Sequence, residues 1–324
     1  TVGVYTSLKL KEDGYDVVAV GRRKSDNGFF ADYGIPYYSV NIVDKNAFDV
    51  LPQEDVDMII HYAGAMPARM KGYDPQVYID TIITGTLNVL EYTRVAGAKK
   101  IVFTQSISDC FWMVKDATPI PADIWRKFPL NNDHSVYVIA KNAAVDLIEH
   151  YYHKYGIKRF ILRLPTIYLY HPDPYYHVNG EKREMWYRLF IDKAMAGEPI
   201  EIWGDASKVK EIVYVKDFVQ IVECCVKATI DGGFYNVGEE ECVSLDEQIK
   251  GTIDVFSPED KKSPIIYRPE MPDPSEFVFD ISKTKNELGY KPQWTYREAL
   301  KDMKHEMETN PFEKLWGKES DYRD

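Results

Sequence analysis

The sequence has few cysteines, no long apolar run and a deficit of positive charge, and each of these excludes a class of protein. Its four cysteines (Cys110, Cys224, Cys225 and Cys242) show no CxxC spacing, which fits a reducing compartment. No apolar run approaches the roughly 20 residues of a membrane helix, and the first residues carry no signal-peptide pattern. The net charge of −11 argues against nucleic-acid binding. We therefore expect a cytoplasmic protein that binds neither nucleic acid nor membrane.

Short apolar runs alternate with longer amphipathic ones in the first half of the chain, which is the rhythm of βαβ units. Strands are predicted at residues 16–20, 36–40, 58–61, 100–104 and 159–163. Longer helices are predicted between them at residues 77–95 and 136–155. This order indicates an α/β fold with a doubly wound parallel sheet (Rossmann) and helices on both faces.

The amino-terminal residues resemble the end of a dinucleotide-binding turn. Gly3 comes directly before an amphipathic helix at residues 4–13, where a glycine-rich turn would hold a pyrophosphate. We expect the first strand and the earlier glycines to precede Thr1. The strand at 16–20 ends in Gly21, Arg22 and Arg23, where an acidic residue would bond a ribose hydroxyl and arginine would favour a 2′-phosphate. Both NAD and NADP stay open, and the arginines favour NADP.

After Pro165 the regular alternation ends. Residues 171–177 (HPDPYYH) are rich in proline and histidine and are predicted to form a loop, and strands return at 211–215 and 234–237. We expect a dinucleotide-binding domain at 1–165 plus about 210–240. A second, smaller α+β substrate domain is expected from the discontinuous segments at about 166–209 and 241–324.

The chemistry is predicted to centre on Tyr137 and Lys141, which are four residues apart and so share one face of a helix. An ammonium beside the phenol would lower its pKa and make the tyrosine a workable acid or base. Ser106 and, second, Ser108 follow the strand at 100–104 and can share a substrate oxygen with the tyrosine. Neither serine lies in the GxSxG turn of a serine hydrolase, which disfavours that rival chemistry.

His61 follows the strand at 58–61 and is more simply a packed histidine than a base. No second His or Cys lies at metal-ligand spacing from it, so no metal is expected. Ala63 and Gly64 are small residues where a backbone could pass close to a cofactor.

Ten short motifs in order resemble the extended short-chain dehydrogenase/reductase family of NAD(P)-dependent nucleotide-sugar epimerases and dehydratases. They include VDMIIHYAG (56–64), GTLNVL (85–90), YVIAK (137–141), RLP (163–165), IWGD (202–205), YVKD (214–217), YNVG (235–238) and ELGYKP (287–292). The resemblance implies that Tyr137 is the acid/base toward a sugar hydroxyl, Lys141 contacts the nicotinamide ribose, and Ser106 shares the sugar oxygen. It also implies a homodimer through the helices at 77–95 and 136–155.

The resemblance assigns further residues to ligands. The expected cofactor contacts are Gly3, Gly21, Arg22, Arg23, Asn41, Ala63, Gly64, Lys141 and Pro165. The expected contacts of a nucleotide-diphosphate sugar are Ser106, Tyr137, Thr166, Lys210 and Arg268, the last two as candidates for its phosphates.

Departures from the family pattern bear on the reaction. Ile82 and Thr166 stand where the family usually has asparagine, and Lys210 stands where it often has arginine. Dehydratases of the family place an acidic pair after the strand hydroxyl, where this chain has Ile107 and Ser108, unless Asp109 is repositioned. We therefore predict epimerisation through a transient keto-sugar, with NADPH-dependent keto-sugar reduction and a non-catalytic cofactor-binding relative as alternatives.

Overall fold

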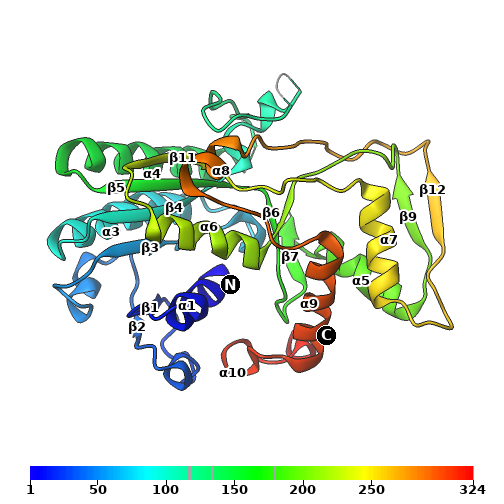
Figure 1. Ribbon diagram of the computed structural model, residues 1–324, viewed down its shortest axis with the longest axis horizontal. Coiled ribbons are helices and arrows are strands. Elements are labelled where there is room, and N and C mark those ends of the chain that lie inside the picture. The colour runs from blue at the N-terminus through cyan, green and yellow to red at the C-terminus, as the bar shows by residue number, and fades with distance from the viewer. Residues whose placement is uncertain (116–117, 133, 179, 324) are drawn as a thin grey trace.

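The computed structural model describes residues 1–115, 118–132, 134–178 and 180–323, and it has the expected α/β architecture (Figure 1). Its strands are β1 (Ala19–Gly21), β2 (Tyr37–Ser39), β3 (Met58–His61), β4 (Lys100–Ser106), β5 (Lys158–Leu164), β6 (Thr166–Tyr168), β7 (Tyr175–Val178), β8 (Glu181–Glu184), β9 (Ile200–Trp203), β10 (Ile212–Tyr214), β11 (Gly232–Asn236) and β12 (Ile265–Arg268). Its α-helices are α1 (Val2–Glu12), α2 (Pro75–Tyr78), α3 (Gly85–Val95), α4 (His134–Tyr155), α5 (Trp186–Ala196), α6 (Val215–Lys227), α7 (Leu245–Phe256), α8 (Ser282–Leu288), α9 (Tyr296–Thr309) and α10 (Glu313–Trp316). Shorter turns are η1 (Phe30–Tyr33), η2 (Lys45–Val50), η3 (Pro67–Arg69), η4 (Ile79–Thr84), η5 (Ile107–Asp109), η6 (Phe111–Met113) and η7 (Glu319–Asp321).

The main sheet has the order β11-β5-β4-β3, and all of its pairs are parallel. Its central strands are continuous apolar runs because both faces of the sheet are covered. Ile101, Val102 and Phe103 of β4 are at most 1% exposed. The strands predicted at 58–61, 100–104 and 159–163 are thereby confirmed.

Alternate side chains of β4 enter two different hydrophobic clusters, as the pleat requires. Ile101 and Phe103 pack in a cluster with α3 and α4, whereas Val102 packs in a cluster that includes α1 and α6. The helices α3 and α4 therefore cover one face, and α6 with α1 covers the other (Figure 1). The predicted doubly wound arrangement is confirmed.

The strands β1 and β2 form a separate parallel pair. Within the described residues, β3 has β4 as its ladder partner and no ladder joins it to β1. Val18 and Val20, before and within β1, are 39% and 46% exposed. The strand begins at Ala19 instead of residue 16, because its pairing with β2 extends over Ala19 to Gly21 alone.

Two predictions of local structure are wrong in part. The predicted loop at 171–177 contains the start of β7, whose four half-buried residues pair antiparallel with β8. The helix predicted at 77–95 is divided into α2, the π-helical turn η4 and α3. A π-turn adds a residue within a helical path, which helical periodicity alone does not reveal.

The second region is assembled from segments that are distant in sequence. The strand β9 pairs parallel with β12, and α5 and α7 pack beside them at one end of the molecule (Figure 1). Capping boxes at Ser244 and Thr295 begin α7 and α9, which pack on each other. The domain limits given above stay a prediction. No helix of the described residues is long and apolar enough to cross a bilayer.

A buried ion pair joins the strand ends of the main sheet. Arg163, in β5, donates from Nε to Asp109 Oδ1 (2.9 Å) and from Nη2 to Asp109 Oδ2 (3.0 Å), and these side chains are 1% and 0% exposed. Arg163 Nη1 also donates to the Ala122 carbonyl (3.1 Å) and to Oδ1 of Asn236 (3.0 Å). Asn236 is the last residue of β11. The Asn236 amide in turn donates to the Ile120 and Asp280 carbonyls. One guanidinium thus fastens β4, β5, β11 and the loop at 120–122 together.

We expect Asp109→Ala to lower the free energy of unfolding by about 3–5 kcal/mol, because it leaves the Arg163 guanidinium buried without its partner. The matched control is Asp146→Ala, which breaks the solvent-exposed Arg126–Asp146 pair and should cost at most about 1 kcal/mol. Equilibrium urea unfolding of both variants measures the difference. Equal losses for the two variants would contradict this role of Asp109.

Candidate active site

Tyr137 and Lys141 lie in the first half of α4 and point into the same buried space. They are 8% and 7% exposed, and four residues separate them, slightly more than one helical turn. The Tyr137 ring packs edge-on against Tyr78 (6.0 Å between centroids) and His134 (5.7 Å). The predicted pair is therefore built into the helix and held by aromatic neighbours.

The Lys141 ammonium is buried between β4 and α4. Its Nζ donates to the Thr104 carbonyl (2.7 Å) and lies 4.4 Å from the centroid of the Phe103 ring. Burial lowers the pKa of Lys141 to about 7. His61 is a neighbouring packed residue: its Nε2 is 3.0 Å from Thr86 Oγ1, and burial, then the charge of Lys141, lower its pKa to about 3. A neutral His61 is the packed histidine that was expected.

Burial raises the pKa of Tyr137 to about 12, and a hydrogen bond with Ser106 acts in the opposite direction. The expectation that Lys141 lowers this pKa is wrong for this structure, because desolvation of the phenol dominates. The bond with Ser106 nevertheless joins the two residues whose combination was predicted. The Tyr137 phenol therefore meets the Ser106 hydroxyl at the end of β4.

The two serines lie at the carboxyl end of β4. Ser106 ends the strand, and its Oγ accepts a hydrogen bond from the Ser108 amide (3.2 Å) and donates one to Ser108 Oγ (3.1 Å). The Ser106 amide donates to Gln105 Oε1 (2.8 Å), and Gln105 Nε2 donates to Asn142 Oδ1 (3.0 Å), which ties the turn to α4. These contacts fix the serine hydroxyls relative to Tyr137.

Three of the predicted cofactor residues follow neighbouring strands of the main sheet. Ala63 and Gly64 come after β3, and Pro165 comes after β5, so parallel pairing brings them to the edge where Ser106 lies. A Cβ on Gly64 would lie 3.4 Å from the Ile82 side chain, which makes a larger residue a tight fit. Gly64 therefore lies against Ile82, at the edge of the sheet where β4 ends in Ser106.

The other predicted cofactor residues lie around α1 and the β1–β2 pair. Gly3 is in the first turn of α1, Gly21 ends β1, and Asn41 follows β2, where its side chain accepts from the Val43 amide (3.4 Å). Arg22 is exposed, whereas the Arg23 guanidinium donates to the Leu315 carbonyl. The two arginines that were treated together thus have different environments.

The predicted substrate residues are distributed over a wider area. Thr166 begins β6, and Lys210 precedes β10, its Nζ 5.7 Å from the centroid of the Trp186 ring. Burial lowers the pKa of Lys210. Arg268 lies on β12, near the opposite end of the long axis from α3, and its guanidinium bonds Glu201 Oε1 (3.2 Å) (Figure 1). The structure therefore does not bring Arg268 together with Tyr137.

Sequence reasoning missed three residues around Tyr137. His134 comes one helical turn before Tyr137, so the helical spacing could have identified it. Tyr78 comes from a distant helix and left no local signal. Asp109 was considered only as a possible acid, and its pairing with Arg163 depends on contacts between residues far apart in sequence.

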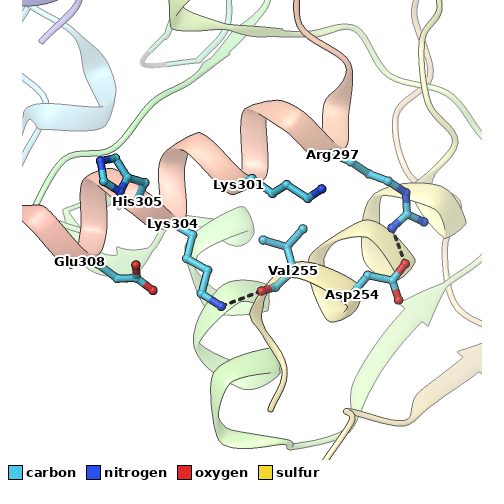
Figure 2. Close-up of a pocket in the computed structure, with 7 residues that line it drawn as sticks. All are labelled: Asp254, Val255, Arg297, Lys301, Lys304, His305 and Glu308. Atoms are coloured by element: carbon cyan, nitrogen blue, oxygen red, sulfur yellow. Dashed lines mark hydrogen bonds and ion pairs between the residues drawn. The ribbon is translucent and has the colours of Figure 1, made fainter. Parts of the chain in front are cut away.

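A hollow of about 570 Å³ between α7 and α9 lies apart from these residues (Figure 2). Arg297 pairs with Asp254, and Lys304 Nζ donates to the Val255 carbonyl (2.9 Å) at the end of α7. These cations are already partnered, and none of the predicted site residues lines the hollow. The described residues also contain no group of three or more His, Cys, Asp or Glu side chains placed to hold a metal.

Comparison with known proteins agrees with this geometry. A model of the NAD dependent epimerase/dehydratase family matches residues 1–238. The chain is 26% identical over 273 residues to the UDP-glucuronate 4-epimerase of Thermodesulfobacterium geofontis (82% of this chain, 77% of that protein). It is 25% identical over 263 residues to the dTDP-glucose 4,6-dehydratase of Xanthomonas campestris (78% and 72%).

Solved structures share the fold over nearly the whole chain. The UDP-glucose 4-epimerase of Thermotoga maritima, solved with UDP-glucose, has a TM-score of 0.76 and 22% identity, covering 96% of each chain. The UDP-glucuronic acid 4-epimerase of Bacillus cereus, solved with NAD and a fluorinated UDP-sugar, has a TM-score of 0.72 and 19% identity (95% and 96%). At these identities the likeness shows a common fold.

The lowered pKa of Lys141 should make the stability of the protein depend on pH. Between the folded pKa of about 7 and the unfolded value of about 10.4, only the unfolded chain binds the proton, so this lysine makes stability rise with pH. We expect the unfolding free energy of the wild type, relative to Lys141→Met, to rise by up to about 1.4 kcal/mol per pH unit between pH 8 and 9. Urea unfolding at several pH values measures this difference. Lys154→Met, an exposed lysine on the same helix, is the control and should behave as the wild type, and a flat difference for Lys141→Met would contradict the burial argument.

Proposed function

The chain belongs to the NAD-dependent epimerase/dehydratase family, and we propose that it epimerises a nucleotide-diphosphate sugar through a transient keto-sugar. The observation that carries this proposal is the meeting of Tyr137, Ser106 and Lys141 at the carboxyl edge of the sheet. Ala63 and Gly64, which follow β3, carry no bulky side chain at the same edge, which suits the close approach of a nicotinamide dinucleotide to the backbone. When bound, that cofactor accepts a hydride from the sugar carbon and returns it to the opposite face.

In this proposal Tyr137 moves the proton of the reacting hydroxyl. The phenolate form removes the proton from the sugar oxygen as the carbonyl forms, and the phenol returns it when the carbonyl is reduced. Ser106 donates a hydrogen bond to the same oxygen and holds it beside the phenol. Lys141, already fixed by the Thr104 carbonyl, would bind the nicotinamide ribose and orient the cofactor against the sugar.

The geometry supports epimerisation over dehydration. Elimination of water needs a further acid and base near the reacting carbons. Asp109 is the acidic residue closest in sequence to the serines, but both of its oxygens accept from Arg163 and its side chain is fully buried. Ile107 and Ser108 occupy the intervening positions. Asp109 is therefore a structural ion-pair partner, and the reaction that needs only Ser106, Tyr137 and Lys141 is favoured.

The structure also bears on the cofactor and the substrate. The NAD bound in several solved relatives supports NAD as the cofactor, whereas Arg22, exposed after β1, keeps NADP-dependent reduction as the alternative; the Arg23 guanidinium is already donating to the Leu315 carbonyl. Among the described residues, Lys210 has no acidic partner although burial disfavours its charge, which suits a phosphate of a nucleotide sugar. The UDP-sugars of several relatives make a UDP-sugar the first substrate to test. The free cysteines support the cytoplasmic location that we propose.

We expect Tyr137→Phe to lower kcat by about 10²–10⁴-fold, because the variant loses the group that transfers the proton. Tyr155→Phe, at the exposed end of the same helix, is the control and should retain activity. The assay incubates each protein with UDP-, GDP-, dTDP- and CDP-sugars, with and without NADPH, and follows the products by NMR. Isomerised sugar without net cofactor use supports epimerisation. Stoichiometric NADPH consumption would instead show that the protein is a keto-sugar reductase. Turnover unchanged in Tyr137→Phe would contradict the mechanism.

We also propose that the protein is a homodimer through α3 and α4. These helices expose large apolar side chains to solvent: Leu87 (38%), Val95 (58%), Ile139 (42%) and Tyr155 (47%). Exposed apolar side chains grouped on neighbouring helices are typical of protein interfaces. A second copy of the chain would cover them.

Leu87→Glu combined with Ile139→Glu should shift the protein to monomers, because the interface would then bury unpaired charges. Light scattering at a fixed protein concentration measures the mass. Met195→Glu introduces the same charge at a residue that is 51% exposed on α5, toward the opposite end of the molecule from α3 and α4, and should leave the mass unchanged (Figure 1). A wild type that is already monomeric would overturn the proposed dimer.

A further inference from the structure

The C-terminal residues 310–323, named here the C-terminal strap, leave α9 and pass close to the amino-terminal elements (Figure 1). The strap includes α10 and η7, and Phe312, Leu315 and Trp316 hold it in place at 4%, 7% and 6% exposure. The Phe312 ring packs on Tyr5 of α1 (4.9 Å between centroids). The strap is therefore a packed element and covers the side of the molecule where α1 lies.

One anchor of the strap is the loop at residues 23–32, which follows β1. The Arg23 guanidinium and the Asn27 amide donate to the strap carbonyls of Leu315 and Lys314, the latter at 3.0 Å. Lys314 Nζ donates to the Gly28 carbonyl (3.1 Å) and pairs with Asp32 Oδ2 (2.6 Å). This loop follows Gly21 and Arg22, the predicted adenosine contacts. It both donates hydrogen bonds to the strap and accepts them from it.

The second anchor lies in the region predicted to bind substrate. Glu319 Oε2 accepts from Arg188 Nη2 (2.8 Å), and this arginine of α5 is 1% exposed. Arg323 pairs with Asp192, also on α5. The Trp316 ring lies 4.6 Å from the His171 ring, centroid to centroid, in the segment that leads to β7. One short segment therefore connects the loop after β1 to α5 and to the hairpin.

We propose that the C-terminal strap retains the nicotinamide cofactor by closing the adenosine end of its site, an inference that rests on the proposed function. A dinucleotide held along the carboxyl edge must have the loop at 23–32 move before it can leave. The strap opposes that movement because it ties the loop to α5 through Lys314 at one end and Arg323 at the other. Retention suits an epimerase, in which the hydride returns to the same sugar and the cofactor is not exchanged.

The strap also borders an open space that a departing ligand could use. Tyr322 lines a hollow of about 520 Å³ together with Arg69, Lys71 and Lys182. Lys182 Nζ donates to the Tyr322 carbonyl (3.3 Å), so the rim of this hollow is attached to the strap. Asp173 lines the same hollow and pairs with Arg69 (2.8 Å), so the strap and this ion pair together limit how far the rim can open.

The test measures how long the protein keeps its cofactor. For the activity assay the wild type and variants are loaded with NAD, passed through a desalting column and assayed with and without added NAD. For the release assay separate samples are loaded with NADH, and its release into excess NAD is followed by fluorescence in stopped flow. We expect Lys314→Ala to release NADH roughly two- to fivefold faster, as expected for the loss of one exposed anchoring ion pair. Its activity after desalting should fall and return when NAD is added, which a misfolded variant would not show. Arg323→Gln cuts the other anchor and should act in the same direction.

Controls separate the strap from the rest of the proposal. Lys318→Gln breaks the exposed Lys318–Glu313 pair within the strap (3.3 Å) without touching either anchor and should release NADH at the wild-type rate. Lys314→Arg should restore slow release. If Lys314→Ala and Arg323→Gln both release NADH at the wild-type rate, the strap proposal is overturned. The proposed function would still stand. A wild type that binds neither NAD nor NADP would instead overturn the proposed function, and with it the strap.

Discussion

The ion pair between Arg163 and Asp109 is the interaction on which the active edge of the sheet depends. Three parallel strands, β4, β5 and β11, end close to Arg163. Without this side chain, the carbonyl groups and loops at their ends would lack fixed hydrogen-bond partners. Arg163 supplies donors to a carboxylate, a carbonyl and an amide oxygen, so one side chain sets the relative positions of β4, β5 and β11. A buried pair of this kind adds little net stability, but it makes other arrangements of the same loops costly.

This constraint also decides which chemistry the edge can perform. Because Asp109 is held by Arg163, the turn after Ser106 presents hydroxyls and no free carboxylate toward Tyr137. Burial then shifts the remaining two groups in opposite directions: it raises the pKa of the Tyr137 phenol and lowers the pKa of Lys141 to about 7, because both lie away from water. These are the two groups to which we assign proton transfer and orientation of the cofactor in the proposed reaction.

The secondary structure around the sheet followed from local patterns, whereas several features of the site did not. The continuous apolar runs in β4 and β5 and the amphipathic α4 were predicted because burial leaves a periodic record in the sequence. The start of β7 was missed because proline and histidine mask a short, half-buried strand. The phosphate contact of Arg268 stays a prediction; the pairing of β12 with β9, which the sequence did not reveal, places this residue beside Glu201.

The sequence by itself determined the α/β order of elements, the shared helical face of Tyr137 and Lys141, and the serines at the end of a strand, because each depends on residues close together in the chain. Tertiary structure alone decided that Asp109 is neutralised by Arg163, that burial and not Lys141 governs the pKa of Tyr137, and that the two arginines after β1 differ. It also decided that the C-terminal strap reaches the loop at 23–32. These outcomes depend on pairs of residues separated by tens to hundreds of positions, whose contacts only the folded chain brings together.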